Sequence, residues 1–159
     1  MKQFTLLLFS AISFAAAANT QQNPGDTSKA KYNLSICHVV MKAFATGDAS
    51  GIDNVVAADF IDHTDQGTIG RDSLKATIVL THKQFPDIKT EILREFADDE
   101  YVFFHTLTKG VGNGEMGMPK GPYEMAGIEV IRIKDAKIVE HWSYIELGDI
   151  MKMLSQMNR

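Results

Sequence analysis

Cysteine, tryptophan and proline are scarce in this chain of 159 residues, which contains one, one and four of them. A single cysteine, Cys37, cannot form a disulfide within the chain or a C-x-x-C motif. This excludes a disulfide framework and the common cysteine-based zinc and redox motifs. Because Cys37 lies in the apolar run "ICHVV", we expect it to be a small buried hydrophobic residue.

Blocks of basic residues and metal-binding histidine motifs are also missing. The net charge is −4 and the charges are dispersed, so we expect no nucleic-acid partner. The five histidines form neither H-x-x-x-H nor H-E-x-x-H, and we predict no metal ion and no cofactor. The glycine-rich segment 110–122 lies between two expected strands, so we interpret it as a hairpin end and not as a phosphate-binding loop.

The longest apolar run stands at the N-terminus. Residues 1–18, "MKQFTLLLFSAISFAAAA", begin with Lys2 and end in alanines that offer an Ala-x-Ala cleavage site, which is typical of a signal peptide. The run is shorter than the roughly 20 apolar residues of a membrane-spanning helix. We expect an exported protein, periplasmic or secreted, with no membrane attachment after cleavage. A flexible linker over 19–29 would precede one folded domain over 30–159.

Helical periodicity dominates the first half of this domain, and a period of two dominates the second half. Apolar residues recur at helical spacing over 32–48, 48–60 and 70–85, and a short helix is expected over 149–158. After Pro86, four segments rich in β-branched and aromatic residues predict four consecutive antiparallel strands. Helices followed by strands indicate an α+β fold in which helices cover one face of a curved sheet.

Strand alternation assigns candidate site residues to faces. In "KIVEHWSYIELGDI" it places Trp142 and Glu146 on one face and His141 and Ser143 on the other. We assign the first pair to a cavity, where desolvation would raise the pKa of the Glu146 carboxyl toward that of a general acid or base; the alternative is a strand-end glutamate in water. In "YVFFHTL" the alternation sets His105 among apolar residues, either in a core or protein contact or in a pocket wall.

Two further segments contribute candidates. His63, in "ADFIDHTDQG", follows the second expected helix and is either a surface turn residue or a pocket residue. The methionines of the glycine-rich segment are adaptable apolar side chains that would border a pocket for an apolar ligand. The predicted substrate-binding residues are Phe60, Tyr101, Met116, Met118 and Trp142.

The order of helices, then "FPDIKTEI", then "GEMGMPKGPYEMAGIEVIRIKDAKIVEHW", resembles the SnoaL-like polyketide cyclase family of the nuclear transport factor 2-like superfamily, over roughly residues 33–157. The resemblance implies a cone-shaped α+β barrel, with N-terminal helices on a curved, mainly antiparallel sheet around an apolar cavity, and a homodimer formed through the sheet. It implies catalysis without a cofactor. Glu146 stands where the family often carries its acid, in W-x-x-x-D, and His63 matches a family histidine after the second helix.

Three functions stay open at this point. The first is an enzyme of the cyclase, isomerase or lyase type, in which Glu146 moves a proton beside the carbonyl of a small apolar compound and His63 or His105 polarises the enolate oxygen. The second is an exported binding protein for a lipophilic small molecule. The third is a homodimeric assembly module whose sheet face, with His141 and Ser143, is the contact. The fold alone does not choose among them.

Overall fold

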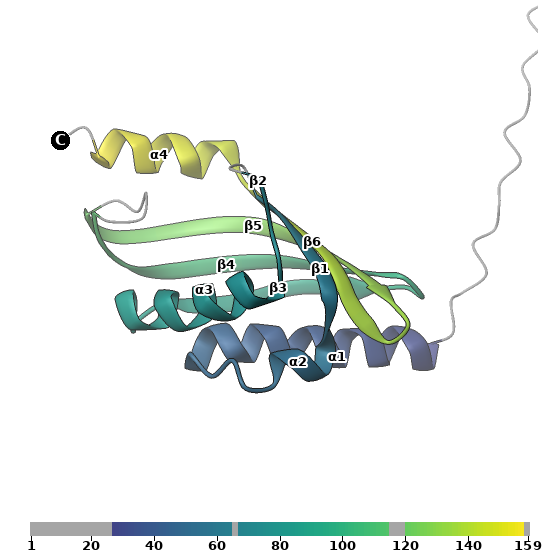
Figure 1. Ribbon diagram of the computed structural model, residues 1–159. Coiled ribbons are helices and arrows are strands. Elements are labelled where there is room, and N and C mark those ends of the chain that lie inside the picture. The colour runs from purple at the N-terminus through teal and green to yellow at the C-terminus, as the bar shows by residue number, and fades with distance from the viewer. Residues whose placement is uncertain (1–26, 65–66, 115–119, 158–159) are drawn as a thin grey trace, which may run out of the picture.

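The computed structural model describes residues 27–64, 67–114 and 120–157 (Figure 1). The expected signal peptide and the linker up to residue 26 lie outside the described residues. The first helix already begins at Thr27, so the last three residues of the expected linker belong to the folded domain. Among the described residues, no helix has the length and apolar character needed to span a membrane.

Helices dominate the first half of the described chain and strands the second. The elements are α1 (Thr27–Thr46), α2 (Ile52–Val55), β1 (Val56–Thr64), β2 (Gly67–Ile69), α3 (Arg71–Gln84), β3 (Lys89–Ala97), β4 (Tyr101–Asn113), β5 (Lys120–Lys134), β6 (Lys137–Ile145) and α4 (Leu147–Met157). The helices expected over 32–48, 70–85 and 149–158 are confirmed as α1, α3 and α4. The four consecutive antiparallel strands are confirmed as β3 to β6.

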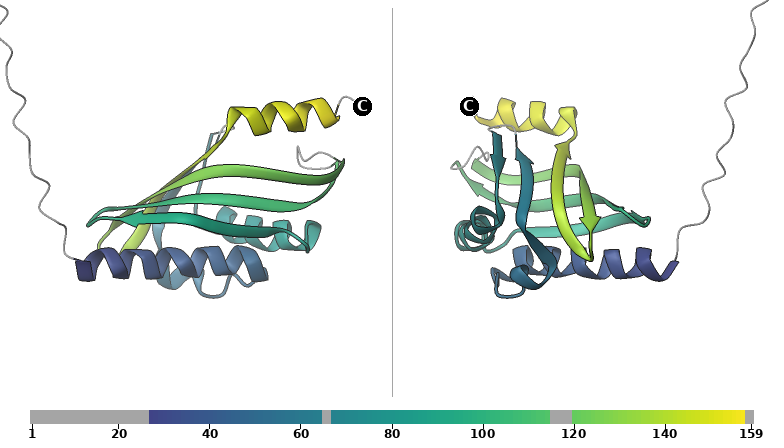
Figure 2. Two further views of the ribbon diagram at one scale, coloured as in Figure 1. Left: turned by 180° about the vertical axis from the view of Figure 1, so that it is seen from behind. Right: turned by 45° about the vertical axis from the view of Figure 1, so that its right-hand side comes forward.

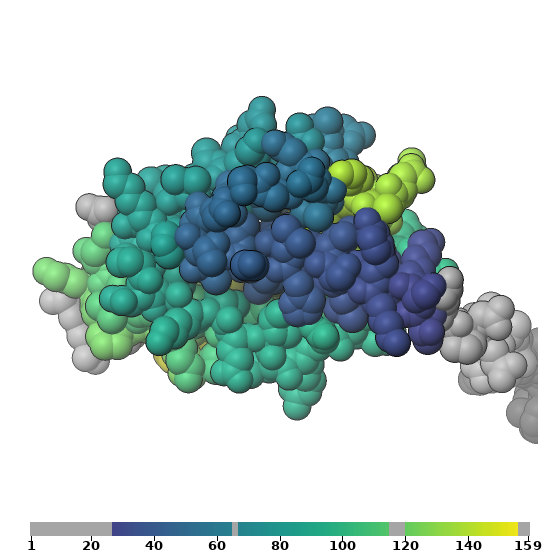
Figure 3. All heavy atoms as spheres, turned by 90° about the horizontal axis from the view of Figure 1, so that it is seen from below, coloured from purple at the N-terminus to yellow at the C-terminus, as the bar shows by residue number. Residues whose placement is uncertain are grey.

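The six strands form one mixed sheet in the order β2-β1-β6-β5-β4-β3. Strands β1 and β6 are parallel, and the other neighbours are antiparallel. In Figure 2 β1, β2 and β6 run steeply across the direction of β3 to β5, so the sheet is strongly curved, and it does not close. Helices α1 and α3 lie together on one side of the sheet, and with α2 they cover that side in Figure 3. We call this side the helix-covered face and the opposite side the outer face. The predicted α+β fold is confirmed.

The second expected helix is wrong over most of its length. Apolar spacing predicted a helix over 48–60, but α2 covers only Ile52–Val55 and strand β1 begins at Val56. Short apolar runs do not distinguish helix from strand, and tertiary pairing decides between them. Here Val56 pairs with Ile138 of β6 and is 1% exposed, so the extended conformation gains a partner strand and a place in the core.

The core lies between the helix-covered face and the helices. Phe104 and Val102 of β4, Ile78 of α3 and Cys37 of α1 are all 0% exposed. Cys37 is therefore the buried hydrophobic residue that the sequence predicted, and its burial raises the pKa of the thiol to about 12. Alternation along β4 makes Val102 and Phe104 face the helices, which turns their neighbours to the outer face.

Helix α4 covers a part of β5 that β6 leaves without a strand partner. Strand β6 ends at Ile145, opposite Gly127, whereas β5 continues toward its start at Lys120. The Ala126 N–H donates to Asp149 Oδ2 of α4 at 2.9 Å, and the Glu146 N–H donates to the Ala126 carbonyl at 3.1 Å. Asp149 of α4 and Glu146, which immediately precedes the helix, thereby satisfy backbone groups that an open edge would expose.

Candidate functional site

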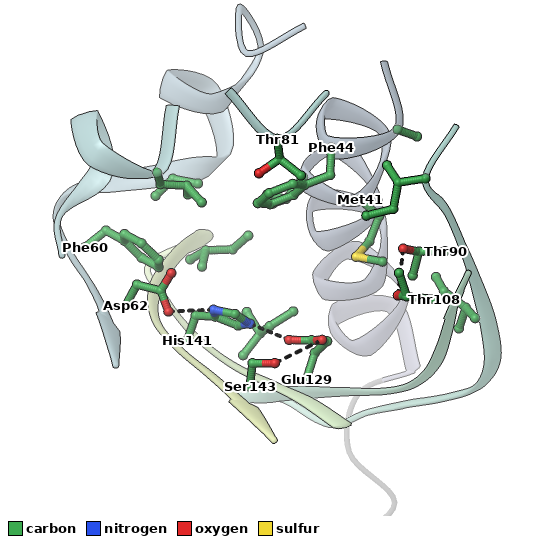
Figure 4. Close-up of a pocket in the computed structure, with 18 of the residues that line it drawn as sticks. Met41, Phe44, Phe60, Asp62, Thr81, Thr90, Thr108, Glu129, His141 and Ser143 are labelled. Atoms are coloured by element: carbon green, nitrogen blue, oxygen red, sulfur yellow. Dashed lines mark hydrogen bonds and ion pairs between the residues drawn. The ribbon is translucent and has the colours of Figure 1, made fainter. Parts of the chain in front are cut away.

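A pocket of about 370 Å³ lies between the helix-covered face of the sheet and helices α1 and α3 (Figure 4). Most of its wall is apolar, as is usual for sites that bind small organic molecules. The apolar lining consists of Val40, Met41, Phe44, Ala45, Val56, Phe60, Leu74, Ile88, Ile92, Met125, Ile131 and Ile138. The polar side chains in the wall are Asp62, Thr81, Thr90, Thr108, Glu129, His141 and Ser143.

Four of these polar side chains form one hydrogen-bonded chain, which we call the Asp–His–Glu cluster after Asp62, His141 and Glu129. His141 Nδ1 lies 2.8 Å from Asp62 Oδ1, and His141 Nε2 lies 2.8 Å from Glu129 Oε2. The Ser143 hydroxyl donates to Glu129 Oε1 at 3.3 Å. Figure 4 shows the chain along one wall, with Phe60 beside Asp62.

The order of the strands brings these residues together. The parallel pairing of β1 with β6 sets Asp62 opposite His141, and the antiparallel pairing of β6 with β5 sets Ser143 opposite Glu129. Residues directly opposite each other in a sheet share a face, so all four side chains point to the helix-covered side. The site therefore depends on a contact between residues that are 79 positions apart in the sequence, Asp62 and His141.

The cluster holds a charged imidazole in an apolar pocket. Burial of His141 disfavours its charged form, but the hydrogen bonds and charges of Asp62 and Glu129 outweigh burial and raise the pKa of His141 to about 9. His141 is therefore an imidazolium at neutral pH. The Asp62 side chain is 13% exposed and that of Glu129 is 22% exposed, so water screens the two carboxylates only in part. Two carboxylates around one cation leave the cluster with a net charge of −1.

Strand alternation assigned the wrong residues of β6 to the cavity. His141 and Ser143 face the pocket, whereas Trp142 lies on the outer face. There its ring stacks on that of His63, with the ring centroids 4.6 Å apart and an angle of 2° between the ring planes. The alternation is correct from Glu140 to Tyr144, but Ile138 lines the pocket on the side of His141, after a register shift in the pairing of β6 with β5. Tertiary packing decides which set the helices cover. His141 and Ser143 line the pocket, and the sheet contact that the assembly hypothesis gave them stays a prediction.

On the outer face His63 takes part in a second histidine–carboxylate pair. His63 Nε2 lies 3.0 Å from Glu140 Oε2, and Arg132 also contacts Glu140. The hydrogen bond from His63, together with that from Arg132, holds the pKa of the Glu140 carboxyl below its ordinary value. Strands β1 and β6 thus carry a histidine–carboxylate pair on each face, and the pair in the pocket is the one built on His141.

His105 and Tyr101 also point away from the pocket. They alternate with Val102, Phe104 and Thr106, which are buried beneath the helices. His105 is half-buried, and its Nδ1 lies 3.4 Å from Arg94 Nη1 of β3. Their predicted grouping on one face is correct, but this face is the outer one.

Glu146 stands outside the pocket, between β6 and α4. It is exposed, and its carbonyl accepts hydrogen bonds from the N–H groups of Asp149 and Ile150 in the first turn of α4. Of the other predicted residues, Phe60 of β1 lies in the pocket wall and is 4% exposed. Met116 and Met118 lie outside the described residues. The predicted roles of Glu146 in catalysis and of Phe60 in binding stay predictions.

Sequence reasoning missed Asp62 and Glu129, although Glu129 left a signal. In "AGIEVIRI" Glu129 alternates with Ile131 and Ile133, so a charged residue occupies the apolar face of a strand. Burial on that face is costly unless the charge is paired, which makes it a marker of a functional site. Asp62 left no such signal because it follows the expected helix over 48–60, in a segment that was expected to be a turn and not a strand.

No group of three or more metal-ligating side chains in the described part of the chain is arranged to hold a metal ion. The Asp–His–Glu cluster uses both imidazole nitrogens of His141 for carboxylates, so neither is directed at an open position. The arrangement can give, accept and hold protons.

Comparison with solved structures defines the class of fold. AclR, a proposed hydroxylase from Streptomyces galilaeus, is 23% identical with a TM-score of 0.63 over 79% of this chain and 96% of its own. IdmH, a proposed polyketide cyclase from Streptomyces antibioticus, is 21% identical with a TM-score of 0.63 over 77% of this chain and 98% of its own. An M. tuberculosis LEH-like epoxide hydrolase is 14% identical with a TM-score of 0.64 over 82% of this chain and 95% of its own.

A solved NTF2-like protein from Anabaena variabilis also matches, at 17% identity and a TM-score of 0.60 over 74% of this chain and 92% of its own, and the fold is of this NTF2-like α+β class. Within the class, the sequence model of the SnoaL-like polyketide cyclases matches residues 36–156. The chain belongs to the SnoaL-like polyketide cyclase family. No curated protein matches it closely enough to count as a relative.

Proposed function

We propose that the protein is a cofactor-free acid–base enzyme, of the aldol cyclase or isomerase type, that acts on a small and largely apolar carbonyl compound. The observation that carries this proposal is the imidazole of His141 held between the carboxyl groups of Asp62 and Glu129 in the wall of an apolar pocket. Membership of a cyclase family supports it. Enzymes that move a proton beside a carbonyl usually combine a general base with a general acid, and the surroundings hold the pKa values of the two groups apart.

In this mechanism Asp62 is the base. Its Oδ1 accepts the hydrogen bond from His141, which leaves Oδ2 outside that bond, whereas both oxygens of Glu129 accept hydrogen bonds. Asp62 takes a proton from the carbon beside the carbonyl, and the electron pair of the broken C–H bond moves onto the carbonyl oxygen as an enolate. The neutral Asp62 then binds His141 less strongly, and the Nδ1–H of His141 becomes available to the enolate oxygen.

The remaining steps return the proton or form a carbon–carbon bond. In an isomerase Asp62 gives its proton back at another carbon of the enolate. In an aldol closure the enolate carbon attacks a second carbonyl of the same molecule, and the proton held by Asp62 passes to the new alkoxide, which restores the Asp62 carboxylate. Glu129 and Ser143 keep the imidazolium in place during both reactions, because Glu129 holds His141 Nε2 and Ser143 holds Glu129.

Hydrogen–deuterium exchange at ketones tests the proton transfer without the natural substrate. A panel of small apolar ketones is incubated with the protein in deuterated buffer, and NMR follows the loss of the proton signal beside the carbonyl. Asp62→Asn should lower the exchange rate about a hundredfold or more, the usual contribution of a general base. Glu140→Gln is the matched control, because it removes a histidine-paired carboxylate from the outer face.

Each variant can contradict the assignment. If Glu140→Gln loses as much exchange as Asp62→Asn, the reaction does not depend on the pocket alone and the assignment to the Asp–His–Glu cluster is wrong. If only Glu146→Gln loses exchange, Glu146 is the acid–base residue, as the sequence predicted. If the wild-type protein exchanges no ketone and carries an apolar compound through purification, the alternative of a lipophilic-ligand binding protein is supported. The apolar lining of the pocket favours that second candidate.

We also propose that the protein is exported and that it forms a homodimer. Export is supported by the signal-peptide pattern of residues 1–18. Dimerisation through the outer face is supported by its exposed apolar side chains, since large exposed apolar patches mark contact surfaces. The exposed fractions are 63% for Phe96, 37% for Phe103, 39% for Ile128 and 58% for Tyr144.

A further inference from the structure

A pair of hydroxyl groups lines the pocket away from the Asp–His–Glu cluster. Thr90 of β3 and Thr108 of β4 stand opposite each other in the sheet, and their Oγ1 atoms are 3.0 Å apart. Both side chains line the pocket. In Figure 4 they lie at the other end of the pocket from Asp62 and Phe60. The proposed acid–base chemistry does not use them.

The hydroxyl pair suits a neutral oxygen group of a ligand. Each hydroxyl has one proton and two acceptor lone pairs, so two hydroxyls that share one hydrogen bond keep one proton and several lone pairs for a third group. A hydroxyl, carbonyl or ether oxygen would fit this pattern. The described pocket lining contains no lysine or arginine, and the Asp–His–Glu cluster has a net negative charge, so a carboxylate on the ligand would be repelled.

The register of the sheet sets the spacing between the two polar ends. Thr108 stands opposite Met125 of β5, and Met125 is four residues from Glu129 along the same strand. At a rise of about 3.3 Å per residue, the hydroxyl pair lies about 13 Å along the strand direction from the row of Glu129. Apolar side chains, among them Met41 of α1, line the space between (Figure 4).

We propose that the pocket binds an elongated, uncharged compound with two oxygen functions, one at the Asp–His–Glu cluster and one at the Thr90–Thr108 hydroxyl pair. The compound has an apolar body between the two functions. The assignment of the reacting carbonyl to the cluster end rests on the proposed function. The hydroxyl pair then selects the substrate and sets its direction in the pocket.

Binding of three matched series of probes tests this selection. The series are straight-chain methyl ketones of increasing length, the same ketones with a terminal hydroxyl, and the same ketones with a terminal carboxylate. Calorimetry or NMR titration measures their dissociation constants. At the length that spans the pocket, the hydroxyketone should bind about fivefold more tightly than the plain ketone, which is the effect of one net hydrogen bond. The keto acid should bind more weakly than either.

The double variant Thr90→Val/Thr108→Val should lose the preference for the hydroxyketone and bind the plain ketone as the wild-type protein does. Thr106→Val is the matched control: it removes a hydroxyl from the same face of β4, but Thr106 does not line the pocket and bonds the Gly127 carbonyl at 3.3 Å. It should keep the preference, and melting temperatures will show that each variant is folded. A wild-type protein without a preference, or a preference that survives the double variant, would overturn the proposal.

Failure of this proposal and failure of the proposed function give different results. If ketone exchange depends on Asp62 but the hydroxyl preference does not depend on Thr90 and Thr108, the acid–base function stands and the two-ended substrate is refuted. If no ketone is exchanged but the preference disappears in the double variant, the pocket still selects two-ended ligands and only the catalytic proposal falls.

Discussion

Raising the pH should cost the protein stability because it removes the proton from His141. In the unfolded chain the imidazole has its ordinary pKa of 6.5, whereas Asp62 and Glu129 outweigh the effect of burial in the folded protein and hold the pKa at about 9. The difference corresponds to about 3 kcal/mol of unfolding free energy. Because the folded-state pKa is the higher one, this contribution is fully present below pH 6.5 and is lost as the pH rises through about 9.

Urea unfolding at a series of pH values measures this loss. The wild-type protein and His141→Gln are compared, so that groups that titrate in both proteins cancel from the difference. The difference in unfolding free energy should shrink by about 3 kcal/mol between pH 6.5 and somewhat above pH 9, with an NMR titration midpoint of the His141 ring near 9. Parallel curves for the two proteins, or a midpoint near 6.5, would refute the electrostatic account of the cluster.

His63→Gln is the matched control for this measurement. It removes the histidine that pairs with a single carboxylate on the outer face of the same two strands. In His63→Gln the unfolding free energy should still fall with rising pH as His141 loses its proton, because the two histidines lie on opposite faces of the sheet. A flattened curve in His63→Gln would mean that the wrong histidine has been assigned.

Two further predictions concern assembly and export. Tyr144→Lys places a charge on the outer face, where the side chain is 58% exposed, and should convert the proposed homodimer to monomers in light scattering without loss of ketone exchange; a wild-type monomer would contradict dimerisation. The intact mass of the protein from the exported fraction should correspond to a chain that begins near residue 18 or 19, and a chain that retains residues 1–18 would contradict signal cleavage.

Local patterns were sufficient for most of the fold. The helices α1, α3 and α4 and the strands β3 to β6 follow from periodicities that their own residues carry. Strand β1 was missed because Ile52, Val55, Val56 and Phe60 have the spacing of a helix. Its extended form depends on pairing with β6, whose residues are about 80 positions away, and no local pattern contains that partner.

The site illustrates the same difference between local and long-range information. Alternation in β6 correctly separates Trp142 and Tyr144 from His141 and Ser143, since side chains of a strand point to opposite faces in turn. It does not say which face helices will cover. Trp142 was assigned to the cavity together with Glu146, but its ring is accommodated on the outer face by stacking on His63.

By itself, the sequence determined the order of most elements, the α+β fold, the family and the division of β4, β5 and most of β6 into two faces, because propensity and periodicity act over a few residues. Tertiary structure alone decided that His141 meets Asp62 and Glu129 beneath α1 and α3 while His63 meets Glu140 on the other side. These contacts join strands distant in sequence. A pKa is set by the charges and burial around a group in space, so the identity of the acid–base cluster appears only once those strands are paired.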